Sequence, residues 1–144
     1  MADLLLIVRI AGRRVALPAS QVEGVVELDG LTPAPGAAPH VAGLSSLRSR
    51  VLTVVDAAAA LDAGQNGAHD LTHAIVVPSG GHPYVLLVDD VEDVVEASAA
   101  PVQITAPLGT GWNRVALGMI DAGDDLLLFV DPHALIAGPA AVHV

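Results

Sequence analysis

The chain has 144 residues, with sixteen acidic residues against six arginines and no lysine, and its formal net charge is −10. This length suits one domain, or two small subdomains that share a core. The negative charge disfavours phosphate backbones and anionic lipid, so we expect no nucleic-acid binding. Without lysine there is no Schiff-base chemistry, and without cysteine there is no disulfide framework and no thiolate metal site.

Short runs rich in Val and Leu alternate with Gly and Pro along the whole chain. This pattern favours short strands over long helices. No apolar run approaches the roughly 20 residues that span a bilayer. The N-terminal apolar run follows Asp3 and has no basic residue before it, so it does not resemble a signal peptide. We therefore expect an all-β protein with minor helix, located in the cytoplasm, with no direct membrane insertion.

The first forty residues predict a hairpin, a strand and a loop. The three arginines Arg9, Arg13 and Arg14 cluster at the tip of that hairpin. The loop contains three prolines and cannot lie inside a sheet. In chain order, the predicted elements are a strand over 4–10, a turn over 11–13, a strand over 14–17, a strand over 22–28 and a loop over 29–40.

Residues 41–61 predict a second hairpin followed by a helix. The apolar runs 41–47 and 51–55 are separated by Arg48-Ser49-Arg50, a suitable length for a hairpin turn. Because the turn lacks glycine, we expect no positive φ at Ser49. Asp56 is placed to cap a short helix over 57–61.

The second half repeats the pattern of the first. Residues 91–96 (VEDVVE) nearly copy 22–27 (VEGVVE), and 126–136 parallels 51–61 as strand, Asp cap and short helix, with Pro132 at the first helical position. This self-similarity predicts a duplicated all-β unit with about five strands in each half. The other predicted elements are a polar connector over 62–70, a strand over 71–77, a turn over 79–83, a strand over 84–88 and a frayed tail over 137–144.

Each residue that could take part in catalysis or metal binding also has a simpler structural explanation. His69 and His73 flank the start of a strand, where they lie too far apart to chelate a metal unaided. Neighbours in a strand point to opposite faces, so Asp89-Asp90 is not an acid–base pair, and Asp124-Asp125 reads as a hairpin turn. Gly109-Thr110-Gly111 is a lone Gly-rich turn without lysine. We expect no enzyme activity, no metal and no cofactor.

The segment 43–57 resembles the signature of the CheW family of chemotaxis coupling proteins and of the CheW-like regulatory domain of the kinase CheA. The family pattern is Gly-x-x-Asn-Leu-Arg-Gly, three residues, then Pro-Val-x-Asp-Leu. The residues that match it in register are Gly43, Leu47, Arg48, Val54 and Asp56. The residues that depart from it are Ser46, Ser49, Thr53 and Ala57.

The resemblance runs from Leu4 to about Ile136 and implies a fold of two packed five-stranded SH3-like β-barrel subdomains. It predicts one CheW-like domain over 1–144 with two intertwined subdomains, approximately 14–65 and 71–137, whose N-terminal strands can pair across the halves. The resemblance also implies that a glutamate of the third strand lies close to the arginine of the hairpin turn. The protein-binding residues that it implies are Glu27 and Arg48. The apolar residues near them, which either line a docking groove or belong to the core, are Val25, Val41 and Leu44, and we expect at least half of these three to be core.

By this resemblance the protein is a non-catalytic scaffold that couples methyl-accepting chemoreceptors to a CheA-type histidine kinase. Its expected partners are the regulatory domain of that kinase and the cytoplasmic tip of a receptor, with recruitment to membrane-associated receptor arrays. The departures at Ser46, Ser49 and Thr53 leave open a divergent CheW-like adaptor for another two-component system. A small-molecule-binding or enzymatic β-barrel that uses the His and Asp groups is a further alternative.

Overall fold

The structure is a computed structural model that describes residues 3–61, 71–123 and 125–138. In these residues, ten strands form two five-stranded sheets, and the helices are short. The strands are β1 (Leu4–Ile10), β2 (Arg13–Pro18), β3 (Gly24–Val26), β4 (Val41–Leu47), β5 (Arg50–Asp56), β6 (Ala74–Ser79), β7 (His82–Leu87), β8 (Asp90–Glu96), β9 (Ala116–Ala122) and β10 (Asp125–Val130). The helices are a 3₁₀ turn (Ala19–Gln21), α1 (Ala57–Ala60), α2 (Thr110–Val115) and α3 (Pro132–Ala137).

The two sheets exchange hairpins between the halves of the chain. Sheet A has the order β8-β1-β2-β10-β9, and sheet B has the order β3-β6-β7-β5-β4. The N-terminal hairpin β1–β2 therefore completes a sheet from the second half, whereas β6–β7 completes a sheet from the first half. The N-terminal strands thus pair across the halves, and so does β6–β7, so that each sheet contains strands from both of the approximate ranges 14–65 and 71–137.

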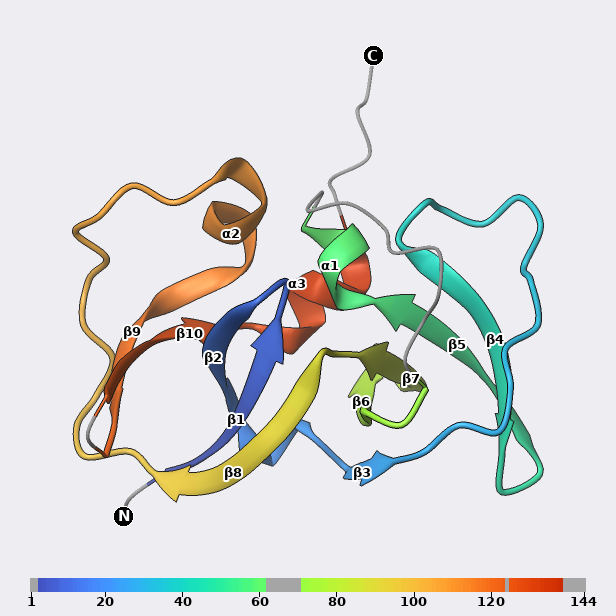
Figure 1. Ribbon diagram of the computed structural model, residues 1–144, viewed down its shortest axis with the longest axis horizontal. Helices are drawn as coiled ribbons and strands as arrows, with labels where there is room; N and C mark the ends of the chain where they lie inside the picture. Colours follow the sequence, from blue (N-terminus) through green and yellow to red (C-terminus); the bar gives the residue numbers. More distant parts are fainter. Residues whose placement is uncertain (1–2, 62–70, 124, 139–144) are drawn as a thin grey trace.

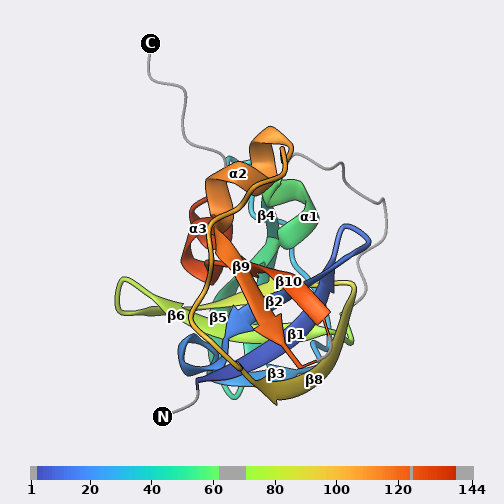
Figure 2. The same cartoon turned by 90° about the vertical axis from the view of Figure 1, so that its left-hand side faces the viewer.

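Figure 1 shows sheet A on the left and sheet B on the right, with α1 and α3 above the junction between them. In Figure 2, which faces the side of sheet A, α2 lies above β9 and β10. The helices α1, α2 and α3 therefore gather at one end of the junction.

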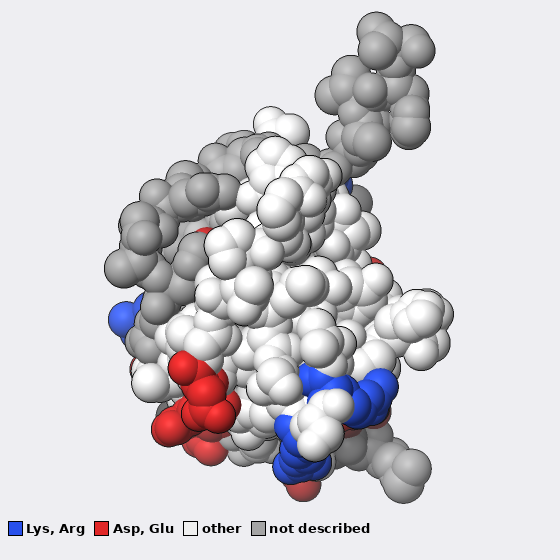
Figure 3. Space-filling view, turned by 90° about the vertical axis from the view of Figure 1, so that its right-hand side faces the viewer, with Lys and Arg blue, Asp and Glu red and all other residues white. Residues whose placement is uncertain are grey.

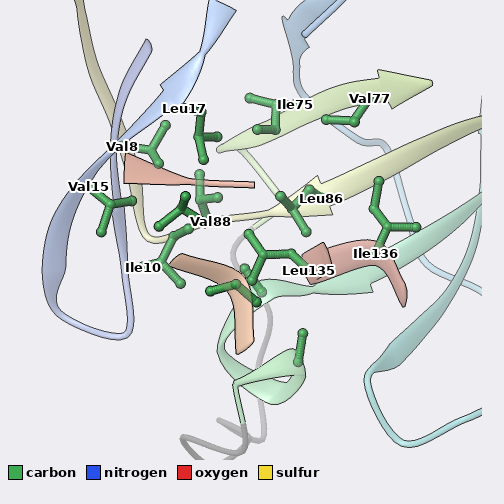
Figure 4. Close-up of a cluster of buried hydrophobic side chains, with 14 of the residues drawn as sticks. Val8, Ile10, Val15, Leu17, Ile75, Val77, Leu86, Val88, Leu135 and Ile136 are labelled. Atoms are coloured by element: carbon green, nitrogen blue, oxygen red, sulfur yellow. The ribbon is translucent and has the colours of Figure 1, made fainter. Parts of the chain in front are cut away.

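A shared hydrophobic core joins the two sheets, because several strands are buried on both faces. Along β1, Leu5 and Ile7 belong to a cluster inside sheet A, whereas Leu6, Val8 and Ile10 belong to the core between the sheets. Figure 4 shows this shared core, to which both sheets and α3 contribute. Its labelled residues are Val8, Ile10, Val15, Leu17, Ile75, Val77, Leu86, Val88, Leu135 and Ile136.

The internal repeat has the same register in both sheets. Gly43 of β4 pairs with Val54, and Gly118 of β9 pairs with Phe129, each beside a β-bulge. Each hairpin then pairs in parallel with a neighbour: β5 with β7, and β10 with β2. Positions in the first hairpin are thus equivalent to positions 69 residues later in β6–β7, and positions in β4–β5 to positions 75 residues later in β9–β10.

The sequence prediction placed most strands within a few residues, with a clear error at the third. The predicted strand over 22–28 is reduced to β3 (Gly24–Val26), because a 3₁₀ turn precedes it and the chain leaves the sheet toward Asp29. The turns predicted over 11–13 and 79–83 are also shorter than expected. Each has two residues, Ala11-Gly12 and Gly80-Gly81, because the flanking residues already pair as strand residues. The connector 62–70 lies outside the described residues.

The hairpin turn of the signature segment corrects another prediction. β5 begins at Arg50, so the turn consists of Arg48 and Ser49 alone. Both residues have positive φ, 52° and 67°, although neither is glycine. Two-residue turns with positive φ match the twist of the strands that they join, and this match outweighs the side-chain preference.

Two predicted helices are confirmed with their caps. The Asp56 carboxylate accepts hydrogen bonds from the backbone N–H groups of Ala58 and Ala59 at the start of α1. Asp131 accepts from His133 N–H at the start of α3, where Pro132 lies in the first turn. Helix α2 was not predicted, because the sequence reads as a Gly-rich turn there. None of the described helices is long and apolar enough to cross a membrane.

Candidate functional site

The predicted binding residues lie on two edges of sheet B. Arg48 is in the turn of the β4–β5 hairpin, Leu44 is in the middle of β4, and Val41 is at the end of β4 far from the turn. Val25 is in the edge strand β3, and Glu27 follows it. Val25 is 52% exposed, and Arg48 and Glu27 are also exposed. Val41 and Leu44 are half-buried, so none of the three apolar residues belongs to the buried core. This part of sheet B therefore presents apolar side chains to solvent next to charged ones.

The structure places Val25 and Arg48 on one hollow of about 180 Å³. Arg48 also lines a second, open hollow of about 610 Å³ together with Leu44. Neither hollow is lined by Glu27 or Val41. The residues around the first hollow are Glu23, Gly24, Val25, Val26, Leu47, Arg48, Arg50, Leu52, Val76 and Pro83.

Glu27 and Arg48 do not form an ion pair. Within the described part of the chain, neither side chain has a hydrogen bond or a salt bridge. Figure 3 faces the side of sheet B and shows an acidic group at the lower left and a basic group at the lower right, with uncharged surface between them; a few more distant acidic atoms adjoin the basic group. Both charged groups are therefore available to an external partner.

Arg50 and Glu23 also line the first hollow, although the resemblance did not single them out. The spacing of the turn could have indicated Arg50, since a two-residue turn places Leu47 opposite Arg50 at the mouth of the hairpin. No signal in the sequence indicated Glu23, because its position depends on how the short edge strand β3 pairs with β6.

The equivalent surface of sheet A carries a network of ion pairs. Glu92 accepts a hydrogen bond from Arg14 at 2.8 Å and another from Arg9 at 3.3 Å, and Arg14 also donates to Asp125 at 2.9 Å. The hydrogen bond to Asp125, followed by the interactions with Glu92, raises the pKa of the Arg14 guanidinium above its usual range. Asp125 therefore belongs to β10 and binds Arg14, instead of lying in the predicted turn with Asp124, which is outside the described residues.

The other candidates for chemistry have structural partners. The Asp89 carboxylate accepts from Gly12 N–H at 2.8 Å, and Asp90 lies 3.4 Å from the His73 imidazole. His69 lies outside the described residues. In the described ranges, no group of three or more His, Asp or Glu side chains could hold a metal ion.

Another hollow, of about 440 Å³, lies beside sheet A, where a small-molecule site could be considered. Its walls are mostly apolar, with Leu4, Pro18 and Phe129 among them, and Asp3 is the one titratable side chain in its lining. A single exposed carboxylate gives no pair of groups for acid–base work. Nothing about this hollow favours the alternative of an enzymatic barrel.

Two five-stranded sheets that share one core define the class of this protein as an all-β, two-sheet domain with minor helix. The chain belongs to the CheW-like domain family, which matches residues 4–140. Its fold is similar to the crystal structure of scaffolding protein TtCheW from Thermoanaerobacter tengcongensis, with a TM-score of 0.80 and 21% sequence identity over 94% of this chain and 92% of that one. No curated protein matches the chain by sequence.

Proposed function

We propose that this chain is a non-catalytic adaptor that couples chemoreceptors to a CheA-type histidine kinase. The observation that carries the proposal is the CheW-like match over residues 4–140, together with a fold similar to that of a scaffolding protein over almost its whole length. The exposed apolar and charged side chains at the β4–β5 tip support a surface that binds protein. Within the described residues, no cluster of groups suggests a competing catalytic role.

The mechanism that we propose is structural. The outer surface of one sheet binds the matching domain of the kinase, and the junction between the sheets takes a receptor helix as a helix-in-groove contact. Edge strands suit such contacts, because their unpaired backbone groups are available to a partner. A change in receptor state then alters the packing at the junction and so biases the conformation of the kinase.

The direct test mixes the purified full-length chain with the regulatory domain of the CheA-type kinase and with a receptor-tip fragment from the same organism. We expect both to bind, and we expect addition of the chain to make kinase activity respond to the receptor state. If neither fragment binds at concentrations up to about 1 mM, corresponding to about −4 kcal/mol, the proposal is wrong.

Charge reversal at Arg48 tests the predicted binding surface. We expect Arg48→Glu to weaken binding of the kinase domain or the receptor fragment by about tenfold or more, whereas the free energy of unfolding should change by less than about 0.5 kcal/mol because the side chain is exposed and unpaired. Isothermal titration and urea denaturation measure the two quantities. A large loss of stability with unchanged affinity would exclude the binding role.

Arg13→Glu is the matched control for this variant. Arg13 begins β2 of sheet A, immediately after the turn of the β1–β2 hairpin, and its guanidinium lies 5.0 Å from the centroid of the Trp112 ring. The substitution makes the same change in net charge at a distance from the proposed surface. We expect it to leave binding unchanged.

The departures from the family pattern favour a second candidate, a CheW-like adaptor of another two-component system. Ser46 is exposed on β4, and Ser49 is exposed in the turn beside Arg48, so both belong to the same surface. A genome neighbourhood without a receptor or a CheA homologue would support this candidate. Reverting the two serines to the family's Asn and Gly should then restore affinity for a CheA-type domain.

A further inference from the structure

Among the residues that the structure describes, four arginines have partners and two have none. Arg9 and Arg14 bind Glu92, Arg13 stacks over Trp112, and Arg114 donates to two backbone carbonyls. Arg48 and Arg50 form no hydrogen bond or ion pair in the part of the chain that the structure describes. The two free cations line the same hollow of sheet B, in a chain with a net charge of −10.

The internal repeat shows why this hollow is open on sheet B. By register, Arg9 and Arg14 of sheet A, which form a cross-strand pair, correspond to Pro78 and Pro83 of sheet B, which pair in the same way. Arg14 reaches across sheet A to Glu92 and Asp125. Proline has no long side chain, so on sheet B nothing equivalent crosses from β7, and Pro83 forms part of the wall of the hollow.

The same comparison shows which charges surround the open position. Glu23 corresponds to Glu92 and keeps its carboxylate, because β3 pairs with β6 as β8 pairs with β1. Arg50 takes the position of Asp125 and reverses its charge. A site that holds an arginine between two carboxylates on sheet A thus becomes, on sheet B, a site with one carboxylate and two arginines. An arginine from a partner would meet two like charges there, whereas a carboxylate would meet two opposite ones.

The walls of the hollow are apolar between these charges. Leu52 is 5% exposed and Val76 is 7% exposed, and both belong to the buried cluster of sheet B. Val25, which also lines the hollow, is 52% exposed. A volume of about 180 Å³ suits a single side chain and not a cofactor.

We propose that this hollow is a docking site for a protein partner that presents an acidic side chain next to an aliphatic one. The carboxylate binds Arg48 and Arg50, and the aliphatic side chain fills the space between Leu52, Val76 and Pro83. Glu23 on the opposite wall repels a second carboxylate, so the partner binds in one orientation. The proposal deepens the proposed function and rests on it, since it names the chemistry that the adaptor surface recognises.

The test combines a reversed charge on this chain with reversed charges on the partner. The kinase regulatory domain and the receptor-tip fragment are each prepared as a set of variants in which one Asp or Glu at a time is changed to Arg. Binding of every variant is measured to the wild-type chain, to Arg50→Glu and to the control Arg13→Glu. We expect Arg50→Glu to bind at least about tenfold more weakly than wild type, as for loss of an interfacial charged contact, and Arg13→Glu to bind normally.

The decisive result is a rescue. One partner variant should bind Arg50→Glu about tenfold more tightly than the unaltered partner does, while binding the wild-type chain more weakly. If wild-type affinity is strong but neither the loss nor the rescue occurs, the docking chemistry is wrong while the adaptor function stands. If the wild-type chain binds neither fragment, the proposed function itself fails. Circular dichroism of Arg50→Glu must match wild type, which separates loss of contact from loss of fold.

Discussion

Gly43 and Gly118 lie at equivalent positions of the repeat, next to the bulges of β4 and β9, and both have positive φ, 154° and 151°. A Cβ on Gly43 would overlap the carbonyl oxygen of Thr32, and a Cβ on Gly118 would lie 2.7 Å from that of Val102. Because each glycine has no side chain, the segment that precedes its strand can lie close enough to pair with that strand. The two pairs are the β-bridges Thr32–Leu44 and Val102–Met119. The family's signature glycine has a backbone role here.

Replacing Gly43 with alanine should therefore destabilise the fold. We expect Gly43→Ala to lower the free energy of unfolding by about 1–3 kcal/mol, since the substitution adds backbone strain and a steric clash with main-chain atoms. Urea denaturation followed by circular dichroism measures this change. Gly30→Ala is the control, because a Cβ there meets nothing within 4 Å. Equal stability of the two variants would show that the Thr32 segment moves away without cost.

The turn residues show where reasoning from single residues was incomplete. The sequence correctly indicated a hairpin at residues 41–56 and the cap at Asp56. It wrongly excluded a positive φ at Ser49, because the preference of one side chain was weighed without the twist of the paired strands. Among the predicted binding residues, the sequence could not show that Glu27 and Arg48 form no ion pair, since that depends on the path of β3 relative to the hairpin.

Helix α2 likewise could not be predicted from its own residues. Its six residues include Gly111 and have no side-chain cap, so local propensity does not predict it. Tertiary contacts hold it in place. Gly111 lies directly against the backbone carbonyl of Leu61, where any larger residue would clash. Arg114 donates to the Ala60 carbonyl at 2.5 Å and to the Gly138 carbonyl at 2.6 Å, next to the ends of α1 and α3.

Arg114 thus joins three helices through carbonyls that their own helices leave unpaired. We expect Arg114→Met, which keeps the apolar stem, to lower the free energy of unfolding by about 1–3 kcal/mol, because two partly buried carbonyls lose a charged donor. Thermal and urea denaturation measure the effect. Arg50→Met is the matched control, since Arg50 has no intramolecular partner among the described residues and should change stability by less than about 0.5 kcal/mol. Equal effects of the two substitutions would contradict this role.

At the scale of the whole molecule, the internal repeat predicted two similar units, and the family resemblance implied that the N-terminal strands can pair across the halves. Neither indicated that the β6–β7 hairpin crosses as well. The β1–β2 and β6–β7 hairpins have the same alternation of apolar residues and the same two-residue turns. This alternation of apolar and polar residues therefore cannot distinguish pairing within one half of the chain from pairing across the halves. The observed exchange places residues from both halves in one core, so the two sheets are not independent folding units.

This shared core predicts that the sheets unfold together. Leu86 of β7 is fully buried in sheet B and belongs to the same cluster as Val15 of β2 in sheet A. We expect Leu86→Ala to cost about 2–5 kcal/mol, the usual effect of a large cavity in a core. Because both sheets share this core, the loss of free energy of unfolding should be the same for the amides of both sheets. Hydrogen exchange of the backbone amides of Val15 and Val54, which lie in different sheets, measures the two losses in one sample.

Val51→Ala is the control for that experiment, because Val51 is 69% exposed and its truncation should change neither amide by more than about 0.5 kcal/mol. A loss of protection confined to the Val54 amide would mean that sheet B opens alone, and the adaptor would then be two loosely coupled units. Equal losses would mean that a partner bound at sheet B stabilises sheet A as well. Such coupling would let a contact at the β4–β5 tip influence a second partner on the opposite side of the molecule.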